Sequence, residues 1–311
     1  MVADTRESAR PHAALLFGPT ASGKTALAVD VSRHLAIEVV SADSRQIYRH
    51  LDVGTAKPTQ QERAAVPHHL VDFLELHETY NAARFAEDAW RACAAIRARG
   101  RLPLIVGGAG FYLHVLREGL FEAPFSSETM HEVRRELQSW SLEALRDELE
   151  RRDPERRRAI HDNDRYRLAR ALEICMASGS NVTALTAARR RPERRFFACR
   201  LQVERAELHR NIERRTAKLL EGGWIDEVRD LLVRYDAALP GFDSLGYPHV
   251  IQHLRGALER AALDECINRD TRRFARHQET WFRKTPAQLT LAAGEDDNVE
   301  RLVRALGACA A

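Results

Sequence analysis

Residues Gly18–Thr25 read Gly-Pro-Thr-Ala-Ser-Gly-Lys-Thr, which matches the pattern of a phosphate-binding loop. The short apolar run 13–17 precedes this loop, as expected of a buried parallel strand, and the run 26–35 after it has helical spacing. In that order, backbone N–H groups and a helix N-terminus can surround a phosphate. The sequence therefore predicts a polyphosphate site made by Gly18, Pro19, Thr20, Ala21, Ser22, Gly23, Lys24 and Thr25.

Lys24 and Thr25 have separate expected roles within this loop. The Lys24 ammonium reaches the outer phosphates, and the Thr25 hydroxyl is placed to ligate Mg²⁺. The chain carries 48 lysines and arginines, of which only residues 24, 57, 218 and 284 are lysine. A compact ammonium at position 24 in such an arginine-rich chain favours a specific phosphate contact, which a guanidinium would not replace.

The order of strand and helix signals predicts the fold class. Apolar strand-like runs occur at 13–17, 37–41, 102–106 and 196–202, with helical spacing between them. We predict an α/β fold: a P-loop NTPase-like parallel sheet core, a helical insertion domain and a helical C-terminal part. The expected core comprises residues 1–117 and 196–311, and the insertion comprises residues 118–195. Helices are expected from 204 to the end of the chain, with residues beyond Gly294 weakly specified.

The strand predicted at 102–106 runs into Gly107-Gly108. An ATPase would normally place its second motif here, an apolar strand that ends in aspartate. The missing carboxylate argues against a motor or switch NTPase.

Asp43 directly follows the strand predicted at 37–41. Carboxyl ends of parallel strands meet at one crevice, so Asp43 is expected to face the phosphate loop. A carboxylate there can ligate Mg²⁺, act as a base or cap the following turn. The adjacent histidines His68 and His69 are expected to be packed or hydrogen-bonded, since adjacent side chains point apart and make a poor metal site.

Positive charge gathers in the insertion. Residues 151–200 hold 14 arginines, no lysine and six acidic residues, an excess of eight positive charges. This excess predicts a nucleic-acid surface. A well-solvated helical face is the alternative. Arg167 and Arg170 are three residues apart on a predicted helix and therefore share one face.

Composition bounds the location of the chain. No apolar run is long enough to cross a bilayer, and residues 1–12 are polar, with no apolar signal core. Five scattered cysteines without a C-x-x-C pair favour free thiols over disulfides or a zinc site. We expect a cytoplasmic protein without membrane contact, and a monomer.

Three segments together resemble one family: Gly18–Thr25, Asp43–Tyr48 and Asp52–Pro58. The chain is similar here to the tRNA dimethylallyltransferases of bacteria, also called tRNA isopentenyltransferases. The resemblance spans about residues 12–284 and includes the segments 67–72, 107–112, 161–173, 246–247, 271–278 and 280–283. The pair formed by segments 43–48 and 52–58 is far more specific than the phosphate loop.

The resemblance implies transfer of a dimethylallyl group from dimethylallyl diphosphate to N6 of the adenosine 3′ of the anticodon in tRNA. The loop then holds a diphosphate and not necessarily ATP, with Mg²⁺ as cofactor, and the insertion grips the anticodon stem-loop. The implied catalytic residues are Asp43 as base, Lys24, Thr25 and, as a second diphosphate clamp, Arg215. The implied tRNA-binding residues are Asp43, Ser44, Arg45, Gln46, Ala109, Arg167, Arg170, Gly246 and Tyr247.

The chain departs from the family pattern at four positions. Ala109 stands where threonine is usual, which removes a hydroxyl near the reacting groups. Asn211 and Pro248 replace basic residues, and His277 lies in a stretch that is usually basic. None of these positions belongs to the diphosphate loop.

Three other functions compete with the transferase. A small-molecule P-loop kinase shares the loop and an inserted helical lid, but gives no reason for the basic insertion. A free-nucleotide isopentenyltransferase performs the same chemistry on AMP, and again leaves the insertion unexplained. A non-catalytic RNA-binding protein would not need an intact Lys24, Thr25 and Asp43.

Overall fold

The computed structural model describes residues 11–121 and 125–310 of the 311-residue chain. Most of the polar N-terminal stretch, residues 1–10, therefore lies outside the described residues. The chain divides into two compact units, one of Met1–Val115 with Glu193–Ala311 and one of Leu116–Pro192. None of the described helices is long and apolar enough to cross a membrane.

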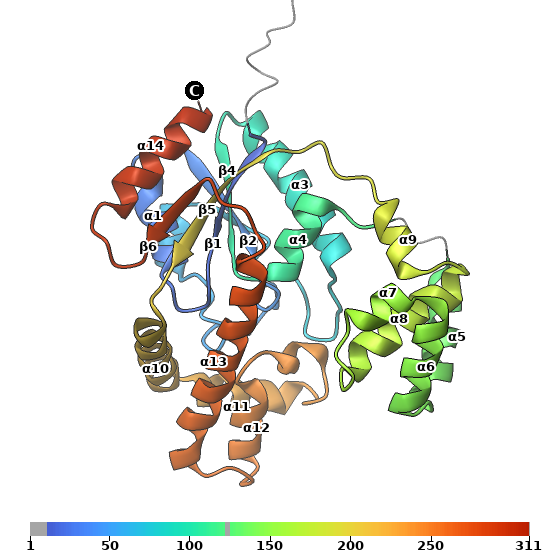
Figure 1. Ribbon diagram of the computed structural model, residues 1–311. Helices are drawn as coiled ribbons and strands as arrows, with labels where there is room; N and C mark the ends of the chain where they lie inside the picture. The colour runs from blue at the N-terminus through green and yellow to red at the C-terminus, as the bar shows by residue number, and fades with distance from the viewer. Residues whose placement is uncertain (1–10, 122–124, 311) are drawn as a thin grey trace, which may run out of the picture. The chain divides into compact units, whose positions relative to one another are not determined.

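The larger unit is built on a six-stranded parallel sheet in the order β3-β2-β4-β1-β5-β6 (Figure 1). This sheet confirms the predicted α/β fold. The strands are β1 (Ala13–Phe17), β2 (Ile37–Ala42), β3 (His68–His69), β4 (Leu102–Gly107), β5 (Phe196–Gln202) and β6 (Leu289–Ala292). Every residue of β1, β2 and β4 is buried, as expected for central strands covered on both faces.

Helices cover both faces of the sheet. On one side α1 (Lys24–Ser32) packs with α14 (Asn298–Ala310), and on the other side lie α3 (Ala82–Ala98) and α4 (Gly110–Glu118) (Figure 1). The short helix α2 (Gln60–Ala65) precedes β3. The Asn81 side chain caps α3 by accepting the Arg84 N–H at 2.9 Å.

A second hydrophobic cluster extends this unit beyond the sheet. It is formed by α11 (Trp224–Arg234), α12 (Tyr247–Leu254) and α13 (Arg260–Phe282) together with residues that follow β2. Helix α10 (Arg205–Glu221) leads into it, and a 3₁₀ turn at Pro240–Asp243 lies between α11 and α12. Trp224, Tyr247 and Phe242 are fully enclosed in this cluster.

The C-terminal part differs from the sequence prediction. We expected helices to the end of the chain, yet β6 pairs in parallel with β5 and α14 follows it. Four residues are too few to show a strand period, and β6 is specified by its pairing with β5 rather than by its own sequence. The two-residue strand β3 was missed for the same reason.

The smaller unit contains only helices among its described residues. They are α5 (Ser127–Gln138), α6 (Leu142–Arg152), α7 (Pro154–Arg158), α8 (Arg165–Ser178) and α9 (Val182–Ala187). Leu145, Leu149, Leu168 and Leu172 are fully buried in its own hydrophobic core. The insertion is therefore a compact helical unit, and its role in RNA binding stays a prediction.

Candidate active site

The phosphate loop leaves the end of β1 and enters α1. Two of its residues adopt the left-handed backbone conformation, Ala21 with φ of 60° and Gly23 with φ of 89°. A Cβ atom at Gly18 would lie 2.4 Å from the Leu201 carbonyl oxygen, so the loop packs too closely on β5 for any other residue. The loop lies between a strand and a helix as the sequence predicts, and its binding of a phosphate stays a prediction.

The Lys24 side chain folds back over this loop. Its Nζ donates to the Pro19 carbonyl at 2.6 Å and to Ser22 Oγ at 3.1 Å. Desolvation, and after it the positive charge of Arg215, lower the pKa of Lys24 to about 7, whereas Asp43 acts in the opposite direction. A bound anion would restore a full positive charge on Lys24.

Arg215 reaches the same loop from α10. Its Nη1 donates to Thr20 Oγ1 at 2.6 Å, and its Nη2 donates to the Thr55 carbonyl at 3.3 Å. Burial lowers the pKa of Arg215, and Asp43 again raises it. Arg215 thus reaches, from a distant part of the chain, the loop that bears Lys24, and the charge of Asp43 acts on both cations. A polyanion would stabilise this arrangement.

Asp43 follows the end of β2 and holds the turn after it. Its Oδ1 accepts the N–H groups of Arg45 at 2.7 Å and of Gln46 at 3.2 Å. The carboxylate therefore caps this turn, which is one of the three roles considered from the sequence. Both hydrogen bonds end on the same oxygen, and the charge of Asp43 acts on Lys24 and Arg215. The turn therefore engages Oδ1 and makes no use of Oδ2.

The other predicted residues after β2 and β4 lie at the same edge of the sheet. Ser44, Arg45 and Gln46 are half-buried in the turn that Asp43 caps. Gln46 Nε2 donates to the carbonyls of Thr55 at 3.3 Å and Ala56 at 2.9 Å. The Ala109 N–H donates to the Ala42 carbonyl at 3.3 Å, which brings the start of α4 against the end of β2.

Glu227 is a residue that the sequence analysis missed. Its carboxylate accepts the N–H groups of Asp52 at 2.8 Å, Val53 at 2.6 Å and Gly54 at 3.3 Å, and the Tyr247 hydroxyl at 2.7 Å. Glu227 fixes the loop that carries the Thr55 carbonyl, and this carbonyl in turn holds the Arg215 guanidinium. The family-specific motif at Asp52–Pro58 was the only sequence signal for this loop. Nothing in that motif identified Glu227 as the residue that binds it.

Gly246 and Tyr247, two residues of the predicted tRNA-binding set, lie in the core, and their contact with tRNA stays a prediction. Tyr247 is completely buried, and its hydroxyl donates to Glu227. Gly246 has a φ of 89°, and a Cβ there would lie 2.2 Å from the Trp224 ring. Both residues support the 52–54 loop from within the core, because neither presents an accessible side chain to a ligand.

Arg167 and Arg170 lie on α8 of the smaller unit and differ in their surroundings. The Arg167 side chain is 64% exposed and lies 3.4 Å from Asp164. Arg170 Nη1 donates at 2.7 Å to the buried Glu173, which also accepts two hydrogen bonds from Arg134. Arg167 is therefore available to a phosphate, whereas Arg170 also neutralises a buried carboxylate.

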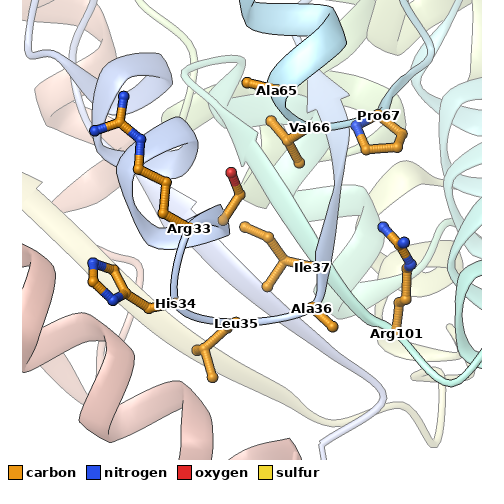
Figure 2. A pocket seen from close by; sticks show the side chains of 10 residues that line it. Arg33, His34, Leu35, Ala36, Ile37, Ala65, Val66, Pro67 and Arg101 are labelled. Atoms are coloured by element: carbon orange, nitrogen blue, oxygen red, sulfur yellow. The ribbon is translucent and has the colours of Figure 1, made fainter.

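A hollow of about 320 Å³ lies at the amino-terminal end of the strands, by the starts of β2 and β4 (Figure 2). Arg33 and Arg101 line it, but each approaches an acidic partner, Asp30 at 3.3 Å and Glu38 at 3.7 Å. The phosphate loop follows the other end of β1, so this hollow is separate from the candidate active site.

The predicted hydrogen bonding of the paired histidines is confirmed. His69 Nε2 lies 2.6 Å from Glu38 Oε2, and His68 Nδ1 lies 2.8 Å from the Val66 carbonyl. Both contacts hold β3 in the sheet, and neither involves a residue of the candidate active site.

Comparison with known proteins identifies the family of this chain. A model of the IPP transferase family matches residues 46–285. The tRNA dimethylallyltransferase of Anaeromyxobacter sp. (strain K) is 44% identical over 296 residues, which cover 93% of this chain and 95% of that protein. The protein of that name from Thermotoga petrophila is 40% identical over 272 residues, covering 87% and 89%. The chain belongs to the IPP transferase family.

Solved structures of IPP transferases share its architecture. The full-length tRNA isopentenylpyrophosphate transferase of Bacillus halodurans is 31% identical, with a TM-score of 0.69 over 96% of both chains. A eukaryotic dimethylallyltransferase acting on tRNA has a TM-score of 0.78 at 23% identity, covering 94% of this chain and 77% of its own. This second likeness is one of fold. Membership of the family decides against a small-molecule kinase.

Proposed function

We propose that this IPP transferase moves a dimethylallyl group from dimethylallyl diphosphate to N6 of the adenosine at position 37 of tRNA, next to the anticodon, and releases pyrophosphate. The observation that carries this proposal is the contact of Arg215, from α10, with Thr20 of the loop that bears Lys24, together with the charge of Asp43 at the end of β2, which acts on both cations. Two cations suit a diphosphate leaving group, and a carboxylate beside them suits an acceptor that must lose a proton.

The phosphate loop is assigned to the diphosphate. Loop N–H groups, Lys24 and Arg215 stabilise the charge that builds on the bridging oxygen as the carbon–oxygen bond breaks. Because Arg215 also donates to the Thr20 hydroxyl and the Thr55 carbonyl, its guanidinium is held in place before the diphosphate binds.

Mg²⁺ fits the groups present at this site. It is commonly held by one or two protein oxygens together with substrate phosphates and water, and the Thr25 hydroxyl at the start of α1 supplies such an oxygen. Asp43 is the nearby carboxylate. When bound, the ion neutralises charge on the diphosphate oxygens.

Asp43 is assigned as the base. The adenine amine attacks the first carbon of the dimethylallyl group, the new carbon–nitrogen bond forms as the carbon–oxygen bond breaks, and the amine proton passes to the carboxylate. Since Oδ1 holds the turn at Arg45 and Gln46, we assign the proton to Oδ2. The adenosine leaves its base stack to reach this group.

The helical insertion is assigned to the anticodon stem-loop. Its excess of arginine suits phosphate contacts, and Arg167 is the exposed member of the predicted pair. We propose that the enzyme acts as a monomer in the cytoplasm, which light scattering of the purified protein and cell fractionation test.

The test is an assay with isotope-labelled dimethylallyl diphosphate and three acceptors: a tRNA with adenosine at position 37, the same tRNA with guanosine there, and AMP. We expect label only in the first, recovered as N6-dimethylallyladenosine after digestion. Label in AMP but not in tRNA would establish the free-nucleotide activity in its place. Lys24→Met is the control for transfer that depends on the loop.

A further inference from the structure

Gln278 of α13 joins two loops that are far apart in the sequence. Its Oε1 accepts the Thr20 N–H at 2.9 Å, and its Nε2 donates to the Gly108 carbonyl at 2.9 Å. The side chain is only 5% exposed, so both ends of the amide are used inside the protein. Thr20 belongs to the phosphate loop, and Gly108 precedes Ala109 at the start of α4.

The amide lies where the sheet stops. The last paired residues of β1 and β4 are Phe17 and Gly107. A primary amide has one acceptor and a donor, as a peptide group does. Gln278 therefore bridges the two segments that follow β1 and β4, with one hydrogen bond to each.

Gly108 is shaped for this contact. A Cβ atom at that position would lie 2.4 Å from Gln278 Nε2. A glycine here lets the amide reach the carbonyl, and any side chain would push α13 away from the loop. The residue after Gly108 is Ala109, and its N–H donates to the carbonyl of Ala42, the residue before Asp43.

The Gln278 contact also affects the position of the phosphate loop, assigned to the diphosphate, and of the segment beside Asp43, assigned to the acceptor. Thr20 is held twice, by Gln278 at its N–H and by Arg215 at its hydroxyl. A shift of Gln278 would move Thr20 relative to Gly108, and so the diphosphate loop relative to the segment beside Asp43.

We propose that Gln278 is a positioning residue, which fixes the distance between the phosphate loop and the Gly107–Ala109 segment and thereby aligns the leaving group with the acceptor amine. The catalytic part of this inference rests on the proposed function. The mechanical part, a clamp between two loops, does not.

The chemistry of the side chain predicts which replacements fail. Methionine has a similar length but neither donates nor accepts strongly at these positions. An ionised glutamate can accept from Thr20 but cannot donate to Gly108, and it would place two oxygens against each other. Both variants should loosen the clamp, and glutamate also adds negative charge near the diphosphate.

The experiment compares Gln278→Met and Gln278→Glu with Gln252→Met, the same replacement at an exposed glutamine of α12. Hydrogen exchange is followed in peptides covering residues 18–25 and 107–113, with strand β2 as the internal reference. Steady-state transfer is measured with saturating and with limiting tRNA.

We expect at least tenfold faster exchange in both loop peptides of the Gln278 variants and unchanged exchange in β2. Transfer should fall in kcat by roughly 10²-fold, as a small misplacement of reacting groups does, with little change in KM for tRNA. The Gln252 variant should match the wild type. Unchanged loop exchange, or a loss confined to KM for tRNA, would overturn the proposal.

If the Gln278 variants do not fold, a measurement on the wild type still tests the proposal. In its NMR spectrum the Gln278 side-chain NH₂ and the Thr20 amide should exchange at least tenfold more slowly than the amides of exposed glutamines and loop residues. Exchange at the rate of a free side chain would refute the clamp. This result does not need activity, so an inactive wild type would reject the proposed function and leave the clamp to be judged by exchange.

Discussion

At the scale of single residues, Lys24 couples diphosphate binding to pH. Desolvation and Arg215 lower the pKa of its ammonium to about 7 in the free protein. A diphosphate placed beside Lys24 favours the charged form and raises that pKa. Binding therefore takes up a proton when the solution is near or above pH 7.

We predict that affinity for inorganic pyrophosphate falls as the pH rises above about 7, by up to about tenfold per pH unit from Lys24. Titration calorimetry in buffers of different ionisation enthalpy measures both affinity and proton uptake. Pyrophosphate itself titrates in this range, so Lys24→Met is the control, and the wild type should take up more protons than the variant at pH 8. Equal uptake would contradict the assignment.

Asp43 combines a structural and a proposed chemical role in one carboxylate. In Asp43→Asn the side-chain oxygen can still accept from Arg45 and Gln46, so the turn should persist. An amide cannot take the proton from the adenine amine. We predict a loss of transfer of roughly 10²–10⁴-fold, with pyrophosphate affinity and melting temperature close to normal.

Two other results would separate the remaining roles of Asp43. A fall in diphosphate and Mg²⁺ affinity in step with rate would make the residue a metal ligand. A rate near that of the wild type would leave it as a turn cap alone.

At the scale of elements, a buried carboxylate ties β2 to its neighbours. Glu38 is 4% exposed, accepts from Arg99 at 3.1 and 2.6 Å, and lies 2.6 Å from His69. The Arg99 hydrogen bonds first, and the single His69 hydrogen bond next, hold the pKa of Glu38 below its ordinary value of 4.5 against the opposing effect of burial.

A carboxylate whose pKa is lowered on folding stabilises the protein above its unfolded pKa, and this contribution is lost as the pH falls through the folded pKa. We predict that Glu38→Gln lowers Tm at pH 7 and that the difference from the wild type shrinks below about pH 4. Thermal melts across pH 3–8 measure this. A difference in Tm that does not change with pH would mean that packing, and not charge, stabilises this strand.

Helix α8 carries two arginines with different duties. Arg170 neutralises the buried Glu173, whereas Arg167 is mostly exposed. We predict that Arg167→Ala weakens tRNA binding and reduces the slope of log affinity against log salt by about one. Arg170→Ala should mainly lower the melting temperature of the protein, because Glu173 loses one of its two partners.

Filter binding across salt concentrations, with thermal melts of the same samples, distinguishes these effects. An unchanged salt slope in the Arg167 variant would mean that this helix face is a solvated surface that does not contact tRNA.

At the scale of the whole molecule, the proposed work is divided between the two compact units. The phosphate loop belongs to the unit built on the sheet, and Arg167 belongs to the helical insertion. We predict that Lys24→Ala abolishes transfer and leaves tRNA affinity within about twofold of the wild type, because this site binds diphosphate and not the RNA backbone.

Equilibrium binding of tRNA and of pyrophosphate to the same preparations checks this division. Arg167→Ala serves as the reciprocal control, with pyrophosphate affinity unchanged. A collapse of tRNA affinity in Lys24→Ala, with transfer intact at saturating tRNA, would reject it.

The sequence by itself determined the features that depend on near neighbours in the chain. The phosphate loop, its strand and helix, and the four longer parallel strands were predictable because spacing of a few residues decides which groups share an element. The family also followed from short segments such as Asp43–Tyr48. Strand β6 was not predictable, since its four residues gain their conformation from pairing with β5.

Only the tertiary structure decided what those side chains contact. The bond of the buried Tyr247 to Glu227, the pairing of Arg134 with Glu173, and the approach of Arg215 to Thr20 all join different elements. Gln278 bonds to residues 258 and 170 positions away, and its sequence gives no sign of either. Such contacts arise because packing of helices on the sheet buries polar groups, which must then find partners wherever the fold brings them.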